Sequence, residues 1–286
     1  MSLKEIKARI ASVKNTRKTT SAMKMVSSVK LRKAQQGVQN ALPYAGQLDD
    51  MLACLVRMPG LSNVPLLNGN SVSRTVIVAV SSDSSLCGSF NTNIIKHTRE
   101  LYGRLKAETG CEPVLFTVGQ KITEHFRKSE IPVRDDFAFL IAGRKYADTA
   151  LFADRLTGMF LSGEAGRVIL TYQHFKSAGS QQIEERQLLP FAVPDGADGS
   201  ETYDCILEPT AGIILDKLMP AAIRMRLYSV LLDSYCAEQA ARVIAMQAAT
   251  DNADNLIAEL TLQYNKLRQQ AITNELLDLA GGQIEN

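Results

Sequence analysis

The residues best suited to chemistry lie in one short polar loop, SSDSSLCG, at positions 81–88. The loop follows an apolar run and precedes a predicted helix, which is the point where α/β nucleotide enzymes cradle phosphates. It lacks the GxGxxG pattern and the lysine of GxxxxGK[ST], so nothing in it places a pyrophosphate or a magnesium ion. We therefore interpret the loop as a strand-to-helix turn and keep phosphate binding as the minor hypothesis.

The other candidate reactive groups also lack sequence partners. Cys87 would need a basic neighbour to act as a nucleophile, and no motif connects it to His97. Asp135 and Asp136 adjoin Arg134 and are interpreted as a solvated acidic pair. The five cysteines and three histidines are scattered without CxxC spacing, which disfavours a zinc site and indicates reduced thiols in a cytosolic compartment. The sequence therefore predicts no catalytic residues, no metal and no cofactor.

Charge is distributed unevenly along the chain. Residues 1–33 hold ten Lys or Arg and one acid, a net charge of +9, whereas residues 251–286 hold six acids and two bases, a net charge of −4. A basic helix can contact nucleic acid, an anionic membrane or an acidic protein surface. The first 33 residues contain no aromatic side chain for base stacking or membrane anchoring. A protein partner is favoured, and a coiled-coil adaptor that binds nucleic acid is the alternative.

The last sixty or so residues, from about 221 to 280, predict one very long helix. Apolar or small residues recur at alternating spacings of three and four, at Val243, Met246, Thr250, Ala253, Ile257, Leu260, Tyr264, Leu267 and Ala271. The same register extends back to Leu218, and residues 221–279 contain neither Gly nor Pro. Pro220 suits a first helical turn, and Gly281 follows the end. A 3.5-residue repeat of this length indicates a coiled coil, and sixty residues would form a rod of roughly 90 Å that projects from the rest of the protein.

The N-terminus predicts the partner helix. Its seam begins with Leu3, Ile6, Ile10 and Val13, and Ser2 with Glu5 forms a capping-box pattern. Beyond these residues the seam becomes small and hydroxylic, at Thr16, Thr19, Thr20, Ala22, Ser27 and Ser28. A break is expected around Gly37 and Pro43, with the helix resuming over residues 44–58.

The middle of the chain predicts a small α/β domain. Apolar β-branched runs at 74–81, 111–119 and 167–174 indicate buried strands, with a short strand near 131–137 and a pairing strand at 182–189. Helices are expected at 94–106, 120–128 and 146–161, and loops at 61–73 and 190–209. The predicted fold is a long antiparallel coiled coil of the two terminal helices, 1–58 and 210–286, with an inserted Rossmann-like α/β domain at 74–190.

Three segments resemble one known family. MSLKEIKARIASVKNTRKTTSAMKMVSSVKLRKAQ and ATDNADNLIAELTLQYNKLRQQAITNELLDLAGG resemble the terminal helices of the gamma subunits of bacterial F-type ATP synthases. SSDSSLCGSFNTNI is similar to the family's SDRGLCGGFN segment, with Ser84 and Ser85 in place of its Arg and Gly. Gly282-Gln283 replaces the family's Gly-Ala near the end.

The resemblance implies a structural subunit and no catalytic role. Family members form the central stalk inside a ring of alpha and beta subunits and dock on the epsilon subunit and the membrane rotor ring, at the cytoplasmic face of the inner membrane. Proton flow turns the ring, and the shaft carries that rotation to the catalytic subunits in a hetero-oligomer without nucleic acid. The implied coupling and partner contacts are Met23, Arg242, Gln269, Thr273 and Glu275, the last four as a polar cluster that links the helices and meets beta.

Overall fold

The computed structural model describes residues 2–56, 64–192 and 207–282. Its contacts group the chain into two compact units, one of residues 2–28 with 242–282 and one of residues 29–241. The elements are α1 (Leu3–Val56), α2 (Pro65–Asn68), β1 (Thr75–Val80), α3 (Phe90–Thr109), β2 (Val114–Val118), α4 (Gln120–Phe126), β3 (Val133–Arg134), α5 (Leu140–Gly143), α6 (Tyr146–Leu161), β4 (Arg167–Ser177), β5 (Ser180–Leu189) and α7 (Ala211–Gly282). Both long helices pass through both units.

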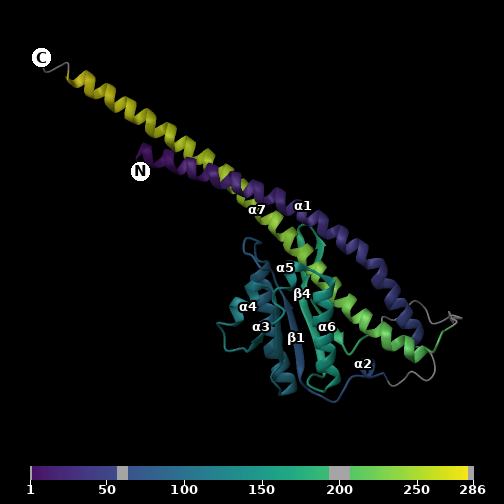
Figure 1. Ribbon diagram of the computed structural model, residues 1–286. Coiled ribbons are helices and arrows are strands. Elements are labelled where there is room, and N and C mark those ends of the chain that lie inside the picture. Colours follow the sequence, from purple (N-terminus) through teal and green to yellow (C-terminus); the bar gives the residue numbers. More distant parts are fainter. Residues whose placement is uncertain (1, 57–63, 193–206, 283–286) are drawn as a thin grey trace. The chain divides into compact units, whose positions relative to one another are not determined.

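The second unit is built on a five-stranded sheet in the order β3-β2-β1-β4-β5. Figure 1 shows β1 and β4 next to each other in this sheet. β1 pairs in parallel with β2 and β4, and β2 pairs in parallel with β3. β5 returns antiparallel along β4 as a hairpin. The predicted strands and the predicted pairing of residues 182–189 are therefore confirmed. The prediction worked for the central strands because β-branched runs without polar alternation fit a sheet covered on both faces.

Alternate residues of the central strand face two different helical layers. Val76, Val78 and Val80 join a core that includes side chains of α6 and α7. Ile77 and Ala79 join a second core that includes side chains of α3 and α4. Every residue of β1 is buried. This period-two division is what a strand between two helical layers requires.

Both prolines predicted near helix boundaries lie inside helices. Pro43 is within α1, which runs without a break past Gly37, and Pro220 is within α7, which begins at Ala211 rather than near residue 221. Proline removes one backbone hydrogen bond and crowds the preceding turn. Buried side chains on both sides of each proline, such as Leu52 beyond Pro43 and Leu215 before Pro220, offset that cost through tertiary packing.

The first half of α7 packs against the sheet as well as against the predicted partner helix. In its apolar repeat over residues 218–239, Ala222 and Met225 belong to the core of the α/β unit, which also contains Leu48 and Leu52 of α1. Arg226 Nη2 of α7 lies 3.0 Å from Asp49 Oδ1 of α1. A repeat of three and four residues specifies a buried helix face, and either a helix or a sheet can cover that face. The predicted loop at 61–73 contains α2, and most of the predicted loop at 190–209 lies outside the described residues.

Candidate functional site: the paired terminal helices

The two terminal segments pair in antiparallel fashion within the first unit. Arg17 Nη1 on α1 lies 2.7 Å from Asp254 Oδ1 on α7. One turn further along α1, the hydroxyls of Thr20 and Thr250 lie 2.9 Å apart. Residue numbers rise on one helix as they fall on the other, so the predicted antiparallel arrangement is confirmed (Figure 1).

The apolar seam of α7 is confirmed at all nine predicted positions, none of which is exposed. Met246, Ala253 and Leu260 are the most buried, at 5%, 7% and 3% exposure. From residue 261 to residue 277, the only positions that are not exposed are Tyr264, Leu267 and Ala271. The 3.5-residue repeat therefore identifies the contact face of this helix correctly.

Fewer of the small residues of α1 are buried at the seam than predicted. Thr20 is half-buried and Ser27 is buried, whereas Thr16, Thr19, Ala22 and Ser28 are exposed. Thr16 and Thr19 donate their hydroxyls to carbonyls of their own helix, at 3.2 and 3.1 Å. If the alternating spacing of three and four residues is continued from Val13, it selects positions 17, 20, 24 and 27. A run of small and hydroxyl side chains was therefore too broad a criterion for the seam positions of α1.

The capping box at the start of α1 is confirmed. The Ser2 backbone N–H donates to Glu5 Oε2 at 2.8 Å, and the Glu5 N–H donates to Ser2 Oγ at 3.3 Å. This reciprocal pair satisfies N–H groups that the first helical turn leaves without intrahelical partners. It fixes where α1 begins, and therefore how far along α7 the pairing can extend.

α7 continues beyond the point where α1 begins. Extending the register of the Arg17–Asp254 and Thr20–Thr250 contacts places Leu3 beside Leu267. α7 continues to Gly282. On this extension Ile272, Leu276 and Leu277 are 48%, 61% and 64% exposed. Apolar residues gathered on one exposed segment are typical of a surface that binds a partner.

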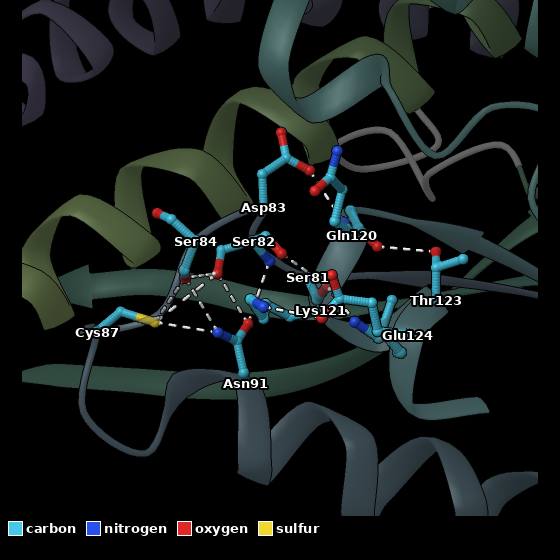
Figure 2. A network of polar contacts seen from close by, with 12 residues as sticks. Ser81, Ser82, Asp83, Ser84, Cys87, Asn91, Gln120, Lys121, Thr123 and Glu124 are labelled. Carbon is cyan, nitrogen blue, oxygen red and sulfur yellow. Dashed lines mark hydrogen bonds and ion pairs between the residues drawn. The ribbon is translucent and has the colours of Figure 1, made fainter. Parts of the chain in front are cut away.

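The loop at 81–88, in the other unit, uses its polar groups internally (Figure 2). Asp83 Oδ1 accepts the Gln120 N–H at 3.0 Å, and Ser81 Oγ accepts the Ile122 N–H at 3.2 Å. The Lys121 N–H donates to the Ser82 carbonyl at 3.1 Å. These are the N-terminal amides of α4, which a phosphate would otherwise need. Burial raises the pKa of Asp83, while the Gln120 hydrogen bond and the charge of Arg144 act in the opposite direction.

A small cluster of the protein's own side chains is buried next to the sheet's switch point, between β1 and β4. Cys87, Phe90 and Ala237 are buried together there, with Phe175 and Ala241 packed against them. The Gln173 side-chain amide also donates to the Phe90 carbonyl at 2.5 Å. Rossmann-like domains bind nucleotides in the crevice at this point. The α7 side chains in this cluster favour the interpretation of the loop as a structural turn.

Three of the remaining candidate reactive groups have polar neighbours within the protein. Cys87 is 1% exposed and accepts a hydrogen bond from Asn91 Nδ2 at 3.3 Å, and His97 Nε2 lies 3.0 Å from Glu185 Oε1. Asp135 forms an ion pair with Arg127, and Asp136 is exposed. Among the described residues, no group of three His, Cys, Asp or Glu could hold a metal ion, and none of the described helices is long and apolar enough to cross a membrane.

Comparison with known proteins now decides the family. A family model described as ATP synthase matches residues 2–284. The ATP synthase gamma chain of Phocaeicola vulgatus is 42% identical over 285 residues, covering 98% of each chain. That of Chlorobaculum tepidum is 40% identical over 286 residues, covering 98% of this chain and 97% of the relative. The chain belongs to the ATP synthase gamma family.

Solved structures of the ATP synthase family share the fold. A chain from the OSCP/F1/c-ring structure of the Euglena gracilis mitochondrial ATP synthase has a TM-score of 0.65 at 16% identity, covering 99% of this chain and 93% of that chain. One from the central stalk and c-ring of the Tetrahymena thermophila enzyme has a TM-score of 0.60 at 22% identity, covering 81% of this chain and 99% of that chain.

The residues that the ATP synthase gamma resemblance singled out do not form one site. Met23 is half-buried, Arg242 is 7% exposed, and Gln269, Thr273 and Glu275 are all exposed. Thr273 Oγ1 donates to the Gln269 carbonyl at 2.9 Å, which keeps both residues on one helical surface. Arg242 lies 27 residues earlier on the same uninterrupted helix, or about 40 Å away. The expected four-residue polar cluster is therefore wrong in including Arg242.

Sequence reasoning missed the contacts that set the pairing register in this gamma-family chain. Arg17 and Asp254 form an ion pair between the helices, yet neither was named as a contact, and Thr250 was named only as a seam position. The 3.5-residue spacing that continues from Val13 would have selected both Arg17 and Thr20. The exposed apolar residues of the extension, Ile272, Leu276 and Leu277, were also missed, because helical periodicity does not show where a partner helix stops.

Proposed function

We propose that this chain is the gamma subunit of a proton-translocating F-type ATP synthase and works as the rotating central shaft. The observation that carries the proposal is the antiparallel pair of terminal helices, from which α7 extends with exposed apolar side chains. Two helices packed along a common seam resist bending and twisting better than one. The exposed apolar residues at the end of α7 are suited to contacts with other subunits that surround it.

The mechanism requires contacts that differ between states of the catalytic ring. A shaft changes a neighbouring subunit's conformation only if it binds one state better than another. The two ends of the chain are asymmetric, because residues 1–33 are strongly basic and residues 251–286 are acidic. Each beta subunit would meet a different side as the shaft turns. One proton crossing the membrane supplies about 2.3 kcal/mol per 100 mV, so a stiff shaft would combine several such steps.

The remaining assignments follow from this role. The shaft would contact the alpha and beta subunits along the helix pair, and the α/β unit would dock on the epsilon subunit and the membrane rotor ring. The chain would be a non-catalytic, peripheral subunit at the cytoplasmic face of the bacterial inner membrane, with phosphoryl transfer assigned to beta. The burial of Phe90 and Ala237 next to the switch point supports that division of labour.

Co-purification tests the proposal directly. Tagged full-length chain should bring down a large complex whose ATP hydrolysis is coupled to proton movement in membrane vesicles. The nucleic-acid adaptor would be supported instead if the chain is recovered alone and binds DNA with an affinity that falls steeply as the salt concentration rises. Arg17, one of the basic residues of segment 1–33, already forms an ion pair with Asp254 of the same chain. This contact gives no support to the adaptor hypothesis.

A lysine at position 23 tests the coupling contact. The half-buried Met23 offers an unbranched apolar side chain that can slide past polar neighbours. Met23→Lys should preserve ATP hydrolysis but lower the protons pumped per ATP, because the added charge would bind acidic groups on beta. Gln36→Lys, which adds the same charge at an exposed position of α1, is the control. Equal pumping ratios in the two variants would remove Met23 from the coupling contacts.

A further inference from the structure

The α/β unit contains a groove formed by two adjoining cavities. The larger, about 520 Å³, lies among α1, the β4–β5 hairpin and α7, and the smaller, about 210 Å³, lies among α1, β5 and α7. Leu42, Arg186 and Ser229 line both cavities. Small-molecule sites in proteins generally occupy about 300–1,000 Å³, so the groove is large enough for a ligand. We call it the Arg186 groove.

The walls of the larger cavity are mainly apolar. Val38 and Leu42 come from α1, Phe175 from β4 and Val230 from α7. Leu42 is 57% exposed, although it lies at the junction of the two cavities. An apolar chain placed here would cover surface that the fold leaves in contact with water, which is favourable in proportion to the area removed.

Most charged groups around the groove already have partners. His174 Nδ1 lies 2.6 Å from Asp233 Oδ2, and Asp233 Oδ1 accepts the Phe175 N–H at 3.0 Å. Glu184 Oε2 accepts the Tyr172 hydroxyl at 3.0 Å. Each of these three side chains therefore has a polar partner, and Glu184 keeps its negative charge at the larger cavity.

The smaller cavity carries excess positive charge. Arg186 and Arg226 both line it, with Asp49 as its carboxylate. Asp49 Oδ1 accepts from Arg226 Nη2 at 3.0 Å, and Arg186 makes no ion pair with any residue that the structure describes. Burial lowers the pKa of Arg226, Asp49 opposes that shift, and the charge of Arg186 adds to it. A second anion beside Arg186 would relieve the repulsion between the two guanidinium groups.

We propose that the Arg186 groove binds an amphipathic carboxylate of the fatty-acid type. The carboxylate would lie at the smaller cavity beside Arg186, where the guanidinium offers a planar pair of donors. The apolar chain would run into the larger cavity along Val38, Leu42 and Val230. Glu184 lines only the larger cavity, so its charge favours this orientation over the reverse one.

Calorimetric titration of the full-length chain with sodium dodecanoate, kept below its micelle concentration, tests the site. Saturable binding is expected, and dodecylammonium, which has the same chain with the opposite charge, should bind about tenfold more weakly or worse. Equal affinity for the two amphiphiles would overturn the proposal. This comparison uses unmodified protein, so it does not depend on the folding of any variant.

Substitutions then locate the ligand. Arg186→Gln should weaken dodecanoate binding about tenfold or more, whereas Arg155→Gln, at an exposed guanidinium on α6, should leave it unchanged. Val38→Trp should abolish binding by filling the larger cavity, with circular dichroism confirming that the variant is folded. Unaltered affinity in Arg186→Gln would contradict the site.

Titration of the assembled complex separates a ligand site from a subunit contact. Binding of dodecanoate to both the isolated chain and the complex supports the proposal. Binding to the isolated chain alone would overturn it, because a neighbouring subunit would then fill the groove.

Discussion

At the scale of single residues, Gly119 shows how closely the loop at 81–88 is packed. Its φ is +103°, and a Cβ at this position would lie 2.6 Å from the Ser81 carbonyl oxygen. Only glycine adopts such a backbone without strain, and no flexible side chain is available to move aside. The turn therefore depends on this residue as much as on its hydrogen bonds to α4.

Gly119→Ala should lower the free energy of unfolding by about 1–3 kcal/mol from backbone strain alone. Gly103→Ala is the matched control, because a Cβ there would meet no atom within 4 Å in the middle of α3. The control should gain up to about 1 kcal/mol in helix propensity. Urea unfolding curves of both variants measure the two effects, and an unchanged Gly119→Ala midpoint would show that the turn can rearrange.

Cys236 should be chemically inert at neutral and mildly alkaline pH. Burial, reinforced by the charge of Asp233, raises the pKa of its thiol from 9.0 to about 12. The reactive thiolate therefore forms only as the pH approaches that value. At pH 8, the thiolate fraction of Cys236 is about a thousandfold lower than that of a thiol with the ordinary pKa. Alkylation by iodoacetamide, followed by mass spectrometry, should label the half-buried Cys111 at least about a hundredfold faster. Comparable rates would mean that the packing around Cys236 opens readily.

At the scale of elements, the pairing of α1 with α7 rests on a register that a cross-link can test. The hydroxyls of Thr20 and Thr250 lie 2.9 Å apart, so cysteines at these positions have side chains close enough for a disulfide. Thr20→Cys with Thr250→Cys should oxidise to a linked pair of peptides, detected by mass spectrometry.

The control for this register pairs Thr20→Cys with Thr261→Cys. Thr261 is exposed on α7 and lies three turns from Thr250, about 16 Å along the helix. This pair should stay unlinked under the same conditions. Efficient cross-linking of the control, or none in the Thr20 and Thr250 pair, would show that the helices adopt another register.

At the scale of the whole molecule, the two units should differ in local stability. The α/β unit buries all of β1 between two helical layers, whereas the helix pair holds few fully buried side chains, such as Ile6 and Leu260. Local opening is easiest where few apolar contacts must break.

In the isolated chain, amides of β1 should therefore exchange with deuterium about a hundredfold more slowly than amides in the first five turns of α1. Assembly with partner subunits should slow exchange in α1 and leave β1 unchanged. Hydrogen exchange read by mass spectrometry measures both. Equal protection of the two segments in the isolated chain would show that the units open as one.

Local patterns in the sequence predicted most of the fold. Continuous β-branched runs identified the buried strands, since only a sheet covered on both faces tolerates them. The 3.5-residue repeat from Val243 to Ala271 identified a helix face that is not exposed at any of its nine positions. The loop at 81–88 was interpreted as a strand-to-helix turn because its composition lacks the glycines and lysine of phosphate-binding motifs, and Asp83 and Ser81 accept N–H groups of α4.

Other features depended on contacts between segments far apart in the chain. Pro220 reads locally as a helix start, yet packing of Leu215 and Met219 keeps the helix intact before it. The family resemblance placed Arg242 in a cluster with Gln269, and the continuous helix separates them. The Arg186 groove likewise brings together residues of α1, β5 and α7, and no local pattern records their proximity.

The sequence by itself determined which residues form helices and strands, and which face of each is buried. Those properties follow from backbone preferences and from the period at which apolar side chains recur. Only the tertiary contacts show what covers each face: the sheet together with α1 for the first half of α7, and α1 for the second half up to the level of Leu3. An apolar stripe requires burial but does not identify its partner, because the hydrophobic effect depends on area removed from water and has no direction.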